Sequence, residues 1–335
     1  MKLGLDTYST RNAGLDPIGT LGLVADLGLQ GVLFDISPFT SFRADDLRAI
    51  RDFAAQKNLY LEMGMGSIFR WHPMAEKGRQ LLADAGYDMA VSDGGIVIHH
   101  LQVARQLGCR LLRCVAGNLF TRDEGHDMAA LADDAVRILR EACSVAQDMG
   151  LKIALENHAD FTVRELASIW SRVNSPALGF TLDTANLGFD LDEPLRLARI
   201  LVPFAWTTHF KNYRIVRTGK GLALENCALG DGEIDVRAIA ELLAERRPEV
   251  NLNIEIHSQF APFTLDILDP TYFSRHPAPP GDGLAWYLTR AWSKEMPQTS
   301  HVNLPDGQES WTLEFEHLKR SIQWARHNLS HILSS

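Results

Sequence analysis

Four short hydrophobic runs in the second half of the sequence each carry, near their end, a residue that can bind a metal ion. The runs are 151–156, 178–183, 205–211 and 252–258, and the residues are Glu156, Asp183, His209 and Glu255. Side chains alternate across a β-strand, so each of these residues falls on the face opposite the aliphatic side chains of its run. A single run of this kind also fits a surface strand with a solvated face, but four in succession predict one converging site.

Three further polar residues lie two positions after a member of this set and share its face: His158, Lys211 and His257. An imidazole titrates near neutrality and is a better base than a metal-bound carboxylate, so His158 is a candidate proton acceptor. The alternative for His158 is an exposed loop histidine. Lys211 is a candidate for binding an oxyanion, a carboxylate or a phosphate, and a solvated or structurally paired lysine is the alternative. His257 is a candidate substrate contact.

Strand-like and helix-like segments alternate along the whole chain, and these segments must position the candidate residues. Earlier strands are expected at 3–8, 31–36, 59–64 and 110–116. Eight strands that alternate with eight helices predict a parallel sheet with right-handed crossovers, closed as a single-domain (β/α)8 TIM barrel over residues 1–335. Active sites of such barrels lie at the carboxyl ends of the strands. A doubly wound open sheet is the alternative, although no GxGxxG motif follows the first strand.

Two segments interrupt this alternation. Residues 214–229 predict a hairpin or a lid. The segment at about 259–285 contains a proline-rich excursion that is too long for a simple connection, which predicts a lid over the site or a subunit contact. We therefore expect a homo-oligomer or a complex with a second subunit. A C-terminal helix is expected at about 311–333.

Charge and composition argue against several classes of protein. The formal net charge is −9 and no basic run is present that could follow a phosphate backbone, so nucleic acid is not an expected partner. No stretch approaches 18 consecutive apolar residues and the first residues lack a cleavable signal pattern, so no membrane partner is expected. The cysteines have no metal-type spacing and predict reduced thiols in a cytoplasmic protein: Cys109, Cys114, Cys143 and Cys227.

The ordered set of four ligand-type residues resembles the metal ligands of the xylose-isomerase-like barrels, the sugar isomerase and epimerase superfamily. The matching motifs are LEN at Glu156, LDTAN at Asp183, THFK at His209 and IEIH at Glu255. The turn LGDGEID (229–235) is similar to the GxGxxD turn that often follows the histidine strand in that superfamily. The resemblance covers about the whole chain and is strongest from 151 to 258.

This resemblance implies that the four residues hold one divalent ion, with Mn²⁺ expected first and Mg²⁺, Co²⁺ or Zn²⁺ as alternatives. Three carboxylates and one imidazole also suit Mn²⁺ or Mg²⁺ by their own chemistry. Such an ion can chelate neighbouring oxygens of a sugar and stabilise the enediolate that forms when a proton leaves the adjacent carbon. In the epimerases of the superfamily the two glutamates act as acid and base, which implies that role for Glu156 and Glu255.

Three positions depart from the ketose epimerases of that superfamily. Asn186 stands where a histidine is usual, and it can hydrogen-bond a hydroxyl but cannot shuttle a proton. Ile215 stands where a substrate-binding arginine is usual, with Arg214 one position before it and Arg217 two after. His158 is an addition. A Glu-x-His of this kind also occurs in relatives that eliminate, including keto-inositol dehydratases and subunits that cleave C-glycosides of 3-keto sugars.

The sequence thus predicts a carbohydrate as substrate, and Asn186, Arg214 and Glu62 join Lys211 and His257 as candidate substrate-binding residues. Arg113 and Glu62 could line the pocket or form ordinary buried ion pairs, and Phe69 and Trp71 fit a hydrophobic wall against a sugar or plain loop packing.

Three functions remain open. The first is a metal-dependent isomerase or epimerase of a sugar or keto-sugar that abstracts a proton next to a carbonyl. The second is a lyase on a keto-sugar or keto-inositol with His158 as base. The third is a non-catalytic sugar-binding barrel, against which the complete ligand quartet argues. A DNA-repair endonuclease of the same barrel type would need more metal-binding histidines and a basic groove.

Overall fold

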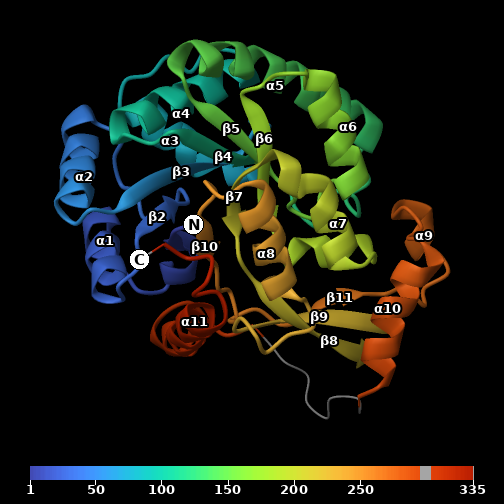
Figure 1. Ribbon diagram of the computed structural model, residues 1–335. Coiled ribbons are helices and arrows are strands. Elements are labelled where there is room, and N and C mark those ends of the chain that lie inside the picture. Colours follow the sequence, from blue (N-terminus) through green and yellow to red (C-terminus); the bar gives the residue numbers. More distant parts are fainter. Residues whose placement is uncertain (295–302, 335) are drawn as a thin grey trace.

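Eight parallel strands form the centre of the molecule (Figure 1). In the computed structural model, which describes residues 1–294 and 303–334, they follow the order β10-β1-β2-β3-β4-β5-β6-β7. The strands are β1 (Leu3–Asp6), β2 (Gly31–Phe34), β3 (Tyr60–Ser67), β4 (Leu111–Val115), β5 (Lys152–Glu156), β6 (Leu178–Asp183), β7 (Ala205–His209) and β10 (Leu252–Ile254). An isolated parallel bridge between Phe210 and Ile254 closes the ring between β7 and β10. The predicted (β/α)8 barrel is confirmed.

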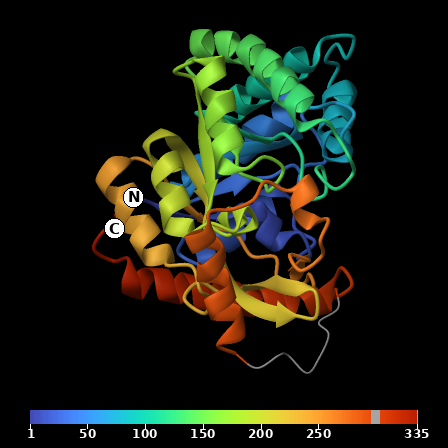
Figure 2. The same cartoon turned by 90° about the vertical axis from the view of Figure 1, so that its right-hand side faces the viewer.

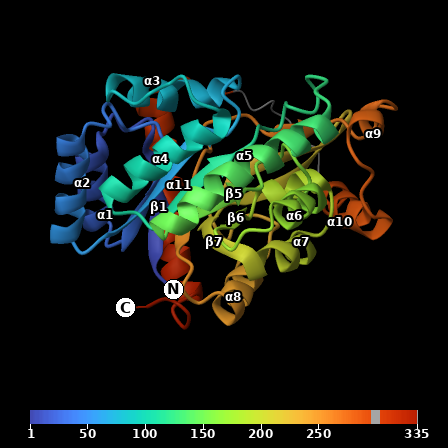
Figure 3. The same cartoon turned by 90° about the horizontal axis from the view of Figure 1, so that it is seen from above.

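Helices surround this ring and connect successive strands (Figure 3). They are α1 (Pro17–Asp26), α2 (Ala44–Gln56), α3 (Glu76–Asp84), α4 (Asp93–Leu107), α5 (Met128–Met149), α6 (Val163–Val173), α7 (Pro194–Leu201), α8 (Val236–Arg246) and α11 (Gln308–Asn328). Their ends follow the local sequence. Gly150 ends α5 in the left-handed conformation with φ 69°, and Thr162 and Glu165 form the expected capping box of α6. The C-terminal helix α11 overlaps most of the expected range of about 311–333, but it begins and ends a few residues earlier.

A second, three-stranded antiparallel sheet lies against the barrel, in the order β11-β9-β8 (Figure 2). It consists of the hairpin β8 (Asn212–Thr218) and β9 (Gly221–Cys227), which the sequence predicted as a hairpin or lid, and of β11 (Phe263–Leu265) from the proline-rich excursion. The excursion also contains α9 (Tyr272–Arg275) and α10 (Gly281–Trp292), and α10 packs against β8. Its role as a lid or an interface stays a prediction.

Polar contacts attach the excursion to the barrel and join the two chain termini. At α9, Arg275 and His276 each lie within 3.1 Å of Asp123 in the loop after β4, so the excursion is attached to the barrel. The chain termini meet where the Met1 ammonium donates to the Ile332 carbonyl at 3.0 Å. None of the described helices combines the length and apolar character that crossing a bilayer requires.

Candidate metal centre

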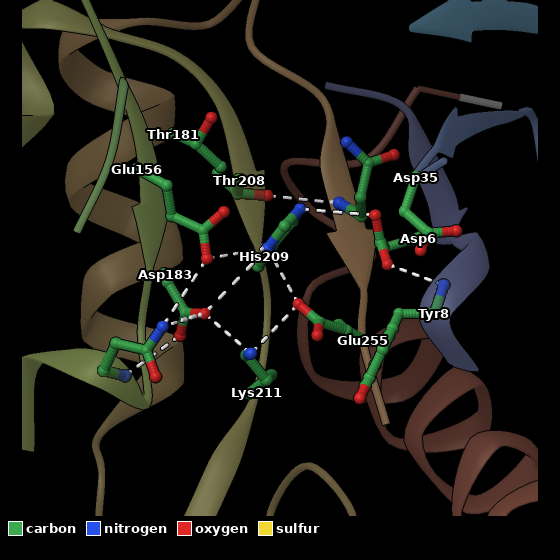
Figure 4. A network of polar contacts seen from close by, with 12 residues as sticks. Asp6, Tyr8, Asp35, Glu156, Thr181, Asp183, Thr208, His209, Lys211 and Glu255 are labelled. Atoms are coloured by element: carbon green, nitrogen blue, oxygen red, sulfur yellow. Dashed lines mark hydrogen bonds and ion pairs between the residues drawn. The ribbon is translucent and has the colours of Figure 1, made fainter. Parts of the chain in front are cut away.

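The four ligand-type residues lie together at the carboxyl ends of their strands (Figure 4). The register pairs Glu156 with Thr181 across β5 and β6, and Asp183 with His209 across β6 and β7. Glu255 follows β10 directly, beside the bridge that closes the barrel. All four side chains are buried, so they face the barrel axis and not the solvent. Strand alternation and equal strand ends therefore bring them to one place.

His209 is the centre of this cluster (Figure 4). Its Nδ1 lies 2.8 Å from Glu255 Oε2, 3.2 Å from Glu156 Oε1 and 3.9 Å from Asp183 Oδ2. Burial by itself would lower the pKa of His209, but the negative charges of the surrounding carboxylates outweigh it and raise that pKa well above its usual value. The cluster attracts positive charge strongly.

Two cations compensate the carboxylates. The Arg113 guanidinium pairs with Glu156 Oε2, and Lys211 Nζ lies 2.7 Å from Asp183 Oδ2 and 3.0 Å from Glu255 Oε2. Burial would raise the pKa of Glu156, but Arg113 and His209 outweigh it and hold that pKa well below its usual value. Arg113 thus forms the buried ion pair that the sequence analysis gave as an alternative, and Lys211 lies inside the cluster.

Asp183 and the turn that follows it form a tightly bonded unit. Asp183 Oδ1 accepts hydrogen bonds from the backbone N–H groups of Ala185 (2.9 Å) and Asn186 (3.0 Å), and Oδ2 accepts from Asn186 Nδ2 (2.7 Å). The Asn157 side chain donates to the Asp183 carbonyl and accepts from the Asp183 N–H. Asn186 therefore lies at the cluster and supports Asp183.

Asp6, at the end of β1, belongs to the same cluster although the sequence analysis did not select it. Its Oδ1 accepts from the Tyr8 N–H at 2.8 Å, and its Oδ2 lies 3.3 Å from His209 Nε2. Burial raises the pKa of Asp6 to about 6, and the neighbouring His209 opposes that rise. The signal was available, because LGLD at 3–6 has the same hydrophobic run ending in a carboxylate as LGFTLD at 178–183.

His158 lies half-buried in the loop after β5, two residues beyond Glu156. Its Nδ1 lies 2.8 Å from the carbonyl oxygen of Gly117, and a carbonyl only accepts, so Nδ1 carries the proton. The neutral ring then has its lone pair on Nε2. The Gly117 N–H donates to Asp160 at 2.5 Å. Ala159, which lies between His158 and Asp160 in the chain, has φ 62°, a conformation that L residues rarely adopt. This loop holds the His158 ring in one orientation.

The remaining candidates lie at different distances from the cluster. His257 Nε2 is 3.5 Å from Lys211 Nζ, and the His257 ring contacts Tyr8, Phe260 and Phe263. Trp71 is exposed and stacks on the buried Phe69 with centroids 5.6 Å apart.

Glu62 and Arg214 lie away from the cluster. Glu62 accepts hydrogen bonds from Thr207, Asn251 and Asn253 deeper in the barrel. Arg214 faces Glu225 at 3.4 Å and Asp231 at 3.7 Å. Neither residue is brought to the site by the structure.

The comparison with known families agrees with this architecture. Residues 21–286 match the model of the family described as xylose isomerase-like TIM barrel. The chain belongs to this family. The match includes all four ligand-type residues and the hairpin β8–β9.

Individual proteins similar to this chain include a decarboxylase, an epimerase and a magnesium-bound barrel protein. A 3-oxo-isoapionate decarboxylase from Pectobacterium atrosepticum is 23% identical over 186 residues, which are 54% of this chain and 65% of that enzyme. The chain thus matches less than two thirds of that relative's length. A D-psicose 3-epimerase from Clostridium cellulolyticum, solved with D-tagatose, superposes with a TM-score of 0.63 at 16% identity, covering 98% and 99% of the two chains. A xylose isomerase-like barrel protein from Mycobacterium smegmatis in complex with magnesium superposes with a TM-score of 0.58 at 16% identity, covering 86% and 97%.

The donor set of this xylose isomerase-like barrel fits a divalent ion. Among the described residues, five buried side-chain polar atoms make no hydrogen bond, and three of them belong to the cluster: Asp6 Oδ2, His209 Nε2 and Glu255 Oε2. Charged groups lie within 3.3 Å of these atoms but are not aligned for hydrogen bonds. Atoms of Glu156, Asp183 and His209 lie within 4.8 Å of one another. Buried carboxylate oxygens without a hydrogen-bond partner, beside an imidazole, are what a hard or borderline cation requires.

Proposed function

We propose that this protein is a divalent-metal-dependent enzyme that isomerises or epimerises a sugar or keto-sugar by removing a proton next to a carbonyl group. The observation that carries the proposal is the convergence of Glu156, Asp183, His209 and Glu255 in one buried cluster at the carboxyl ends of the strands. The epimerase neighbour supports this class of chemistry, and the magnesium-bound neighbour supports the binding of a divalent ion. Mn²⁺ is the expected ion, with Mg²⁺, Co²⁺ and Zn²⁺ as alternatives.

The residues of the chain have separate roles in this proposal. Glu156, Asp183, His209 and Glu255 would hold the ion. When bound, it would polarise the carbonyl of the substrate and stabilise the negative charge that develops on its oxygen. Glu156 and Glu255 lie 3.2 Å and 2.8 Å from His209 Nδ1 and so flank the proposed ion site from two sides, which places a carboxylate on either side of a bound substrate. One would remove the proton and the other would return it.

Polar side chains around the cluster would orient the substrate. Asn186 Nδ2 lies 3.5 Å from Glu156 Oε1 and is placed to donate to a hydroxyl beside that carboxylate. Lys211 and His257 lie next to Glu255 on the opposite side. Because Asn186 replaces the usual histidine, proton transfer at this position would have to use another group.

A lyase is the second candidate, and two observations favour it. The orientation of His158 leaves a lone pair on Nε2, which makes it a candidate general base that is not itself a ligand. A curated relative of the chain is a decarboxylase, which breaks a carbon–carbon bond. Both candidates begin by forming negative charge next to a carbonyl, and they differ in what happens to that charge.

Metal analysis combined with solvent-deuterium exchange tests the proposal. The purified protein is analysed for bound metal and then incubated in D₂O with ketoses and 3-keto-sugars while NMR follows each C–H position. Exchange with a conserved carbon skeleton supports the isomerase or epimerase. Exchange together with loss of water, carbon dioxide or an aglycone supports the lyase. A protein that binds no metal and catalyses no exchange would contradict both, and the His209→Ala variant is the inactive control.

A further inference from the structure

Every hydrogen-bonding position of the Asp183 carboxylate is already in use. Oδ1 accepts from two backbone N–H groups, and Oδ2 accepts from Asn186 Nδ2 at 2.7 Å while Lys211 Nζ lies 2.7 Å away. A carboxylate offers about four lone-pair positions. The backbone donors to Oδ1 are fixed by the turn at 183–186. An ion can therefore bind Asp183 only if one of the two partners of Oδ2 leaves.

Lys211 is the partner that an ion would displace. It is a full positive charge, and it bridges Asp183 and Glu255, two of the four residues that would hold the ion (Figure 4). A dication between these carboxylates repels the ammonium, because like charges a few ångströms apart in a buried site interact strongly. Asn186 is neutral and makes only a dipolar contact, so the same repulsion does not act on it.

Displacement of the Lys211 ammonium has to come from its side chain, because its backbone is fixed by Thr184. The Lys211 N–H donates to Thr184 Oγ1 at 2.8 Å, and Thr184 Oγ1 donates to the Lys211 carbonyl at 2.6 Å. Movement is thus confined to the four-carbon side chain. His257 Nε2, 3.5 Å from Nζ, is a neutral acceptor position that the ammonium can use after it leaves the carboxylates.

We propose that Lys211 is an internal counter-cation of the ligand cluster: it neutralises Asp183 and Glu255 when no ion is bound, and a divalent ion must displace it. This inference rests on the proposed metal-dependent function. It implies that Lys211 weakens metal binding and stabilises the metal-free protein. It also implies that the displaced ammonium becomes available to a negatively charged substrate oxygen only in the metal-bound protein.

The test compares Mn²⁺ affinity of the wild type and the Lys211→Met variant by isothermal titration calorimetry. We expect the variant to bind Mn²⁺ at least tenfold more tightly, because the competing charge is absent. Two variants serve as matched controls. Lys220→Met removes an exposed lysine at the tip of the β8–β9 hairpin, 3.6 Å from Asp266, and should leave the affinity unchanged. Asn186→Ala frees the same Asp183 oxygen without changing charge and should tighten binding less than Lys211→Met.

The outcomes separate this inference from the proposed function. A wild type that binds Mn²⁺ with the same affinity as Lys211→Met, or more tightly, overturns the inference and leaves the metal-dependent function standing. If neither protein binds Mn²⁺, Mg²⁺, Co²⁺ or Zn²⁺ in the same titrations, both are overturned. Mn²⁺ binding to Lys211→Met alone supports the inference in its strongest form. Equal tightening by Asn186→Ala would show that a free lone pair, and not the charge of Lys211, controls the affinity, and would overturn the inference as well.

A measurement on the wild type keeps the inference testable even if Lys211→Met fails to fold without metal. In protein labelled with ¹⁵N-lysine, the Nζ signal of Lys211 is assigned with the Lys211→Arg variant and followed as diamagnetic Mg²⁺ is added. Displacement predicts a shift of this signal that saturates together with Mg²⁺ binding, while the Lys220 signal stays in place. An Nζ signal that does not change at Mg²⁺ saturation overturns the inference.

Discussion

Asp6 and His209 face each other across the intervening strand β10, with Asp6 Oδ2 3.3 Å from His209 Nε2, while Nδ1 of the same ring lies among Glu156, Asp183 and Glu255. An ion at Nδ1 would take the lone pair of that nitrogen, and the ring proton would then lie on Nε2, which faces Asp6. Histidine ligands of metals commonly have such a partner. Asp6 on β1 thus orients the ligand His209, which lies on β7 in the second half of the chain.

The first prediction concerns this pair. Asp6→Asn should weaken Mn²⁺ binding by about 10- to 100-fold, the usual effect of removing the partner of a histidine ligand. The matched control is Asp35→Asn, because the Asp35 carboxylate accepts from Thr7 and Ser37 and forms neither a hydrogen bond nor an ion pair with His209. Calorimetric titration with Mn²⁺ measures both variants. Equal affinity of Asp6→Asn and the wild type would show that Asp6 does not prepare His209.

The second prediction concerns the ligand set. Glu156→Gln and His209→Ala should each lose bound metal and activity. Glu156→Gln also removes the partner of the buried Arg113, which by analogy with other buried pairs costs about 3–5 kcal/mol of folding stability, so circular dichroism must confirm that the variant is folded. Glu62→Gln is the control, since Glu62 is a buried carboxylate of the same barrel outside the cluster. A variant with full metal occupancy would remove its residue from the ligand set.

The third prediction separates the two candidate reactions. If Glu156 and Glu255 carry the protons, His158→Gln should keep its metal and change the rate of solvent-deuterium exchange less than tenfold. A loss of about 10²–10⁴-fold with unchanged metal content is the range expected for a missing general base and would favour the lyase. Metal analysis and exchange rates measured on the same samples distinguish these results from simple unfolding.

The fourth prediction concerns stability against pH and uses a histidine far from the metal centre. Burial lowers the pKa of His100 to about 4, and the ring packs between Phe42 and the backbone of Gly78. The unfolded chain takes up a proton near pH 6.5 and the folded one only near pH 4, so stability contributed by neutral His100 is lost as pH falls through this window. The loss amounts to about 3 kcal/mol at most.

His100→Phe should remove this part of the pH dependence. The difference in unfolding free energy between the variant and the wild type is measured by urea denaturation at pH 7.5 and pH 4.5, both with a chelator present. We expect the unfolding free energy of the variant, relative to that of the wild type, to be higher at pH 4.5 than at pH 7.5. The neighbouring His99, whose ring is partly exposed, provides the control His99→Phe. An identical pH dependence of wild type and His100→Phe would contradict the assignment.

The barrel could be predicted because strand parity and strand–helix alternation are local patterns. Equal strand ends then place Glu156, Asp183, His209 and Glu255 at one height, which is why their convergence could be anticipated. The position of a residue along the barrel axis is harder to predict from the sequence. The sequence suggested a third strand at 59–64, but β3 continues to Ser67, so Glu62 lies deeper than a residue near a strand end.

Other features depend on contacts between distant segments. On β8 the alternation of side chains turns Arg214 toward Glu225 and Asp231 and away from the cluster. Which face of β8 points to the cluster depends on how the hairpin packs against the barrel. The pairing of β11 with β9 joins residues about 40 positions apart, with prolines nearby that hide the strand. The pairing of Arg113 with Glu156 required knowing that β4 and β5 are neighbours with that register. Local periodicity contains none of this information.

The barrel closes between β7, which supplies His209, and β10, which Glu255 follows directly. One backbone bridge at Phe210 closes it, with the Phe210 N–H donating to the Asn253 carbonyl at 2.7 Å and the Glu255 N–H donating to the Phe210 carbonyl at 3.2 Å. An ion held by both side chains would link β7 and β10 where the barrel has its weakest backbone pairing. Metal binding would thus add to the closure that the backbone already provides, and β7 and β10 are the strands whose association it would strengthen most.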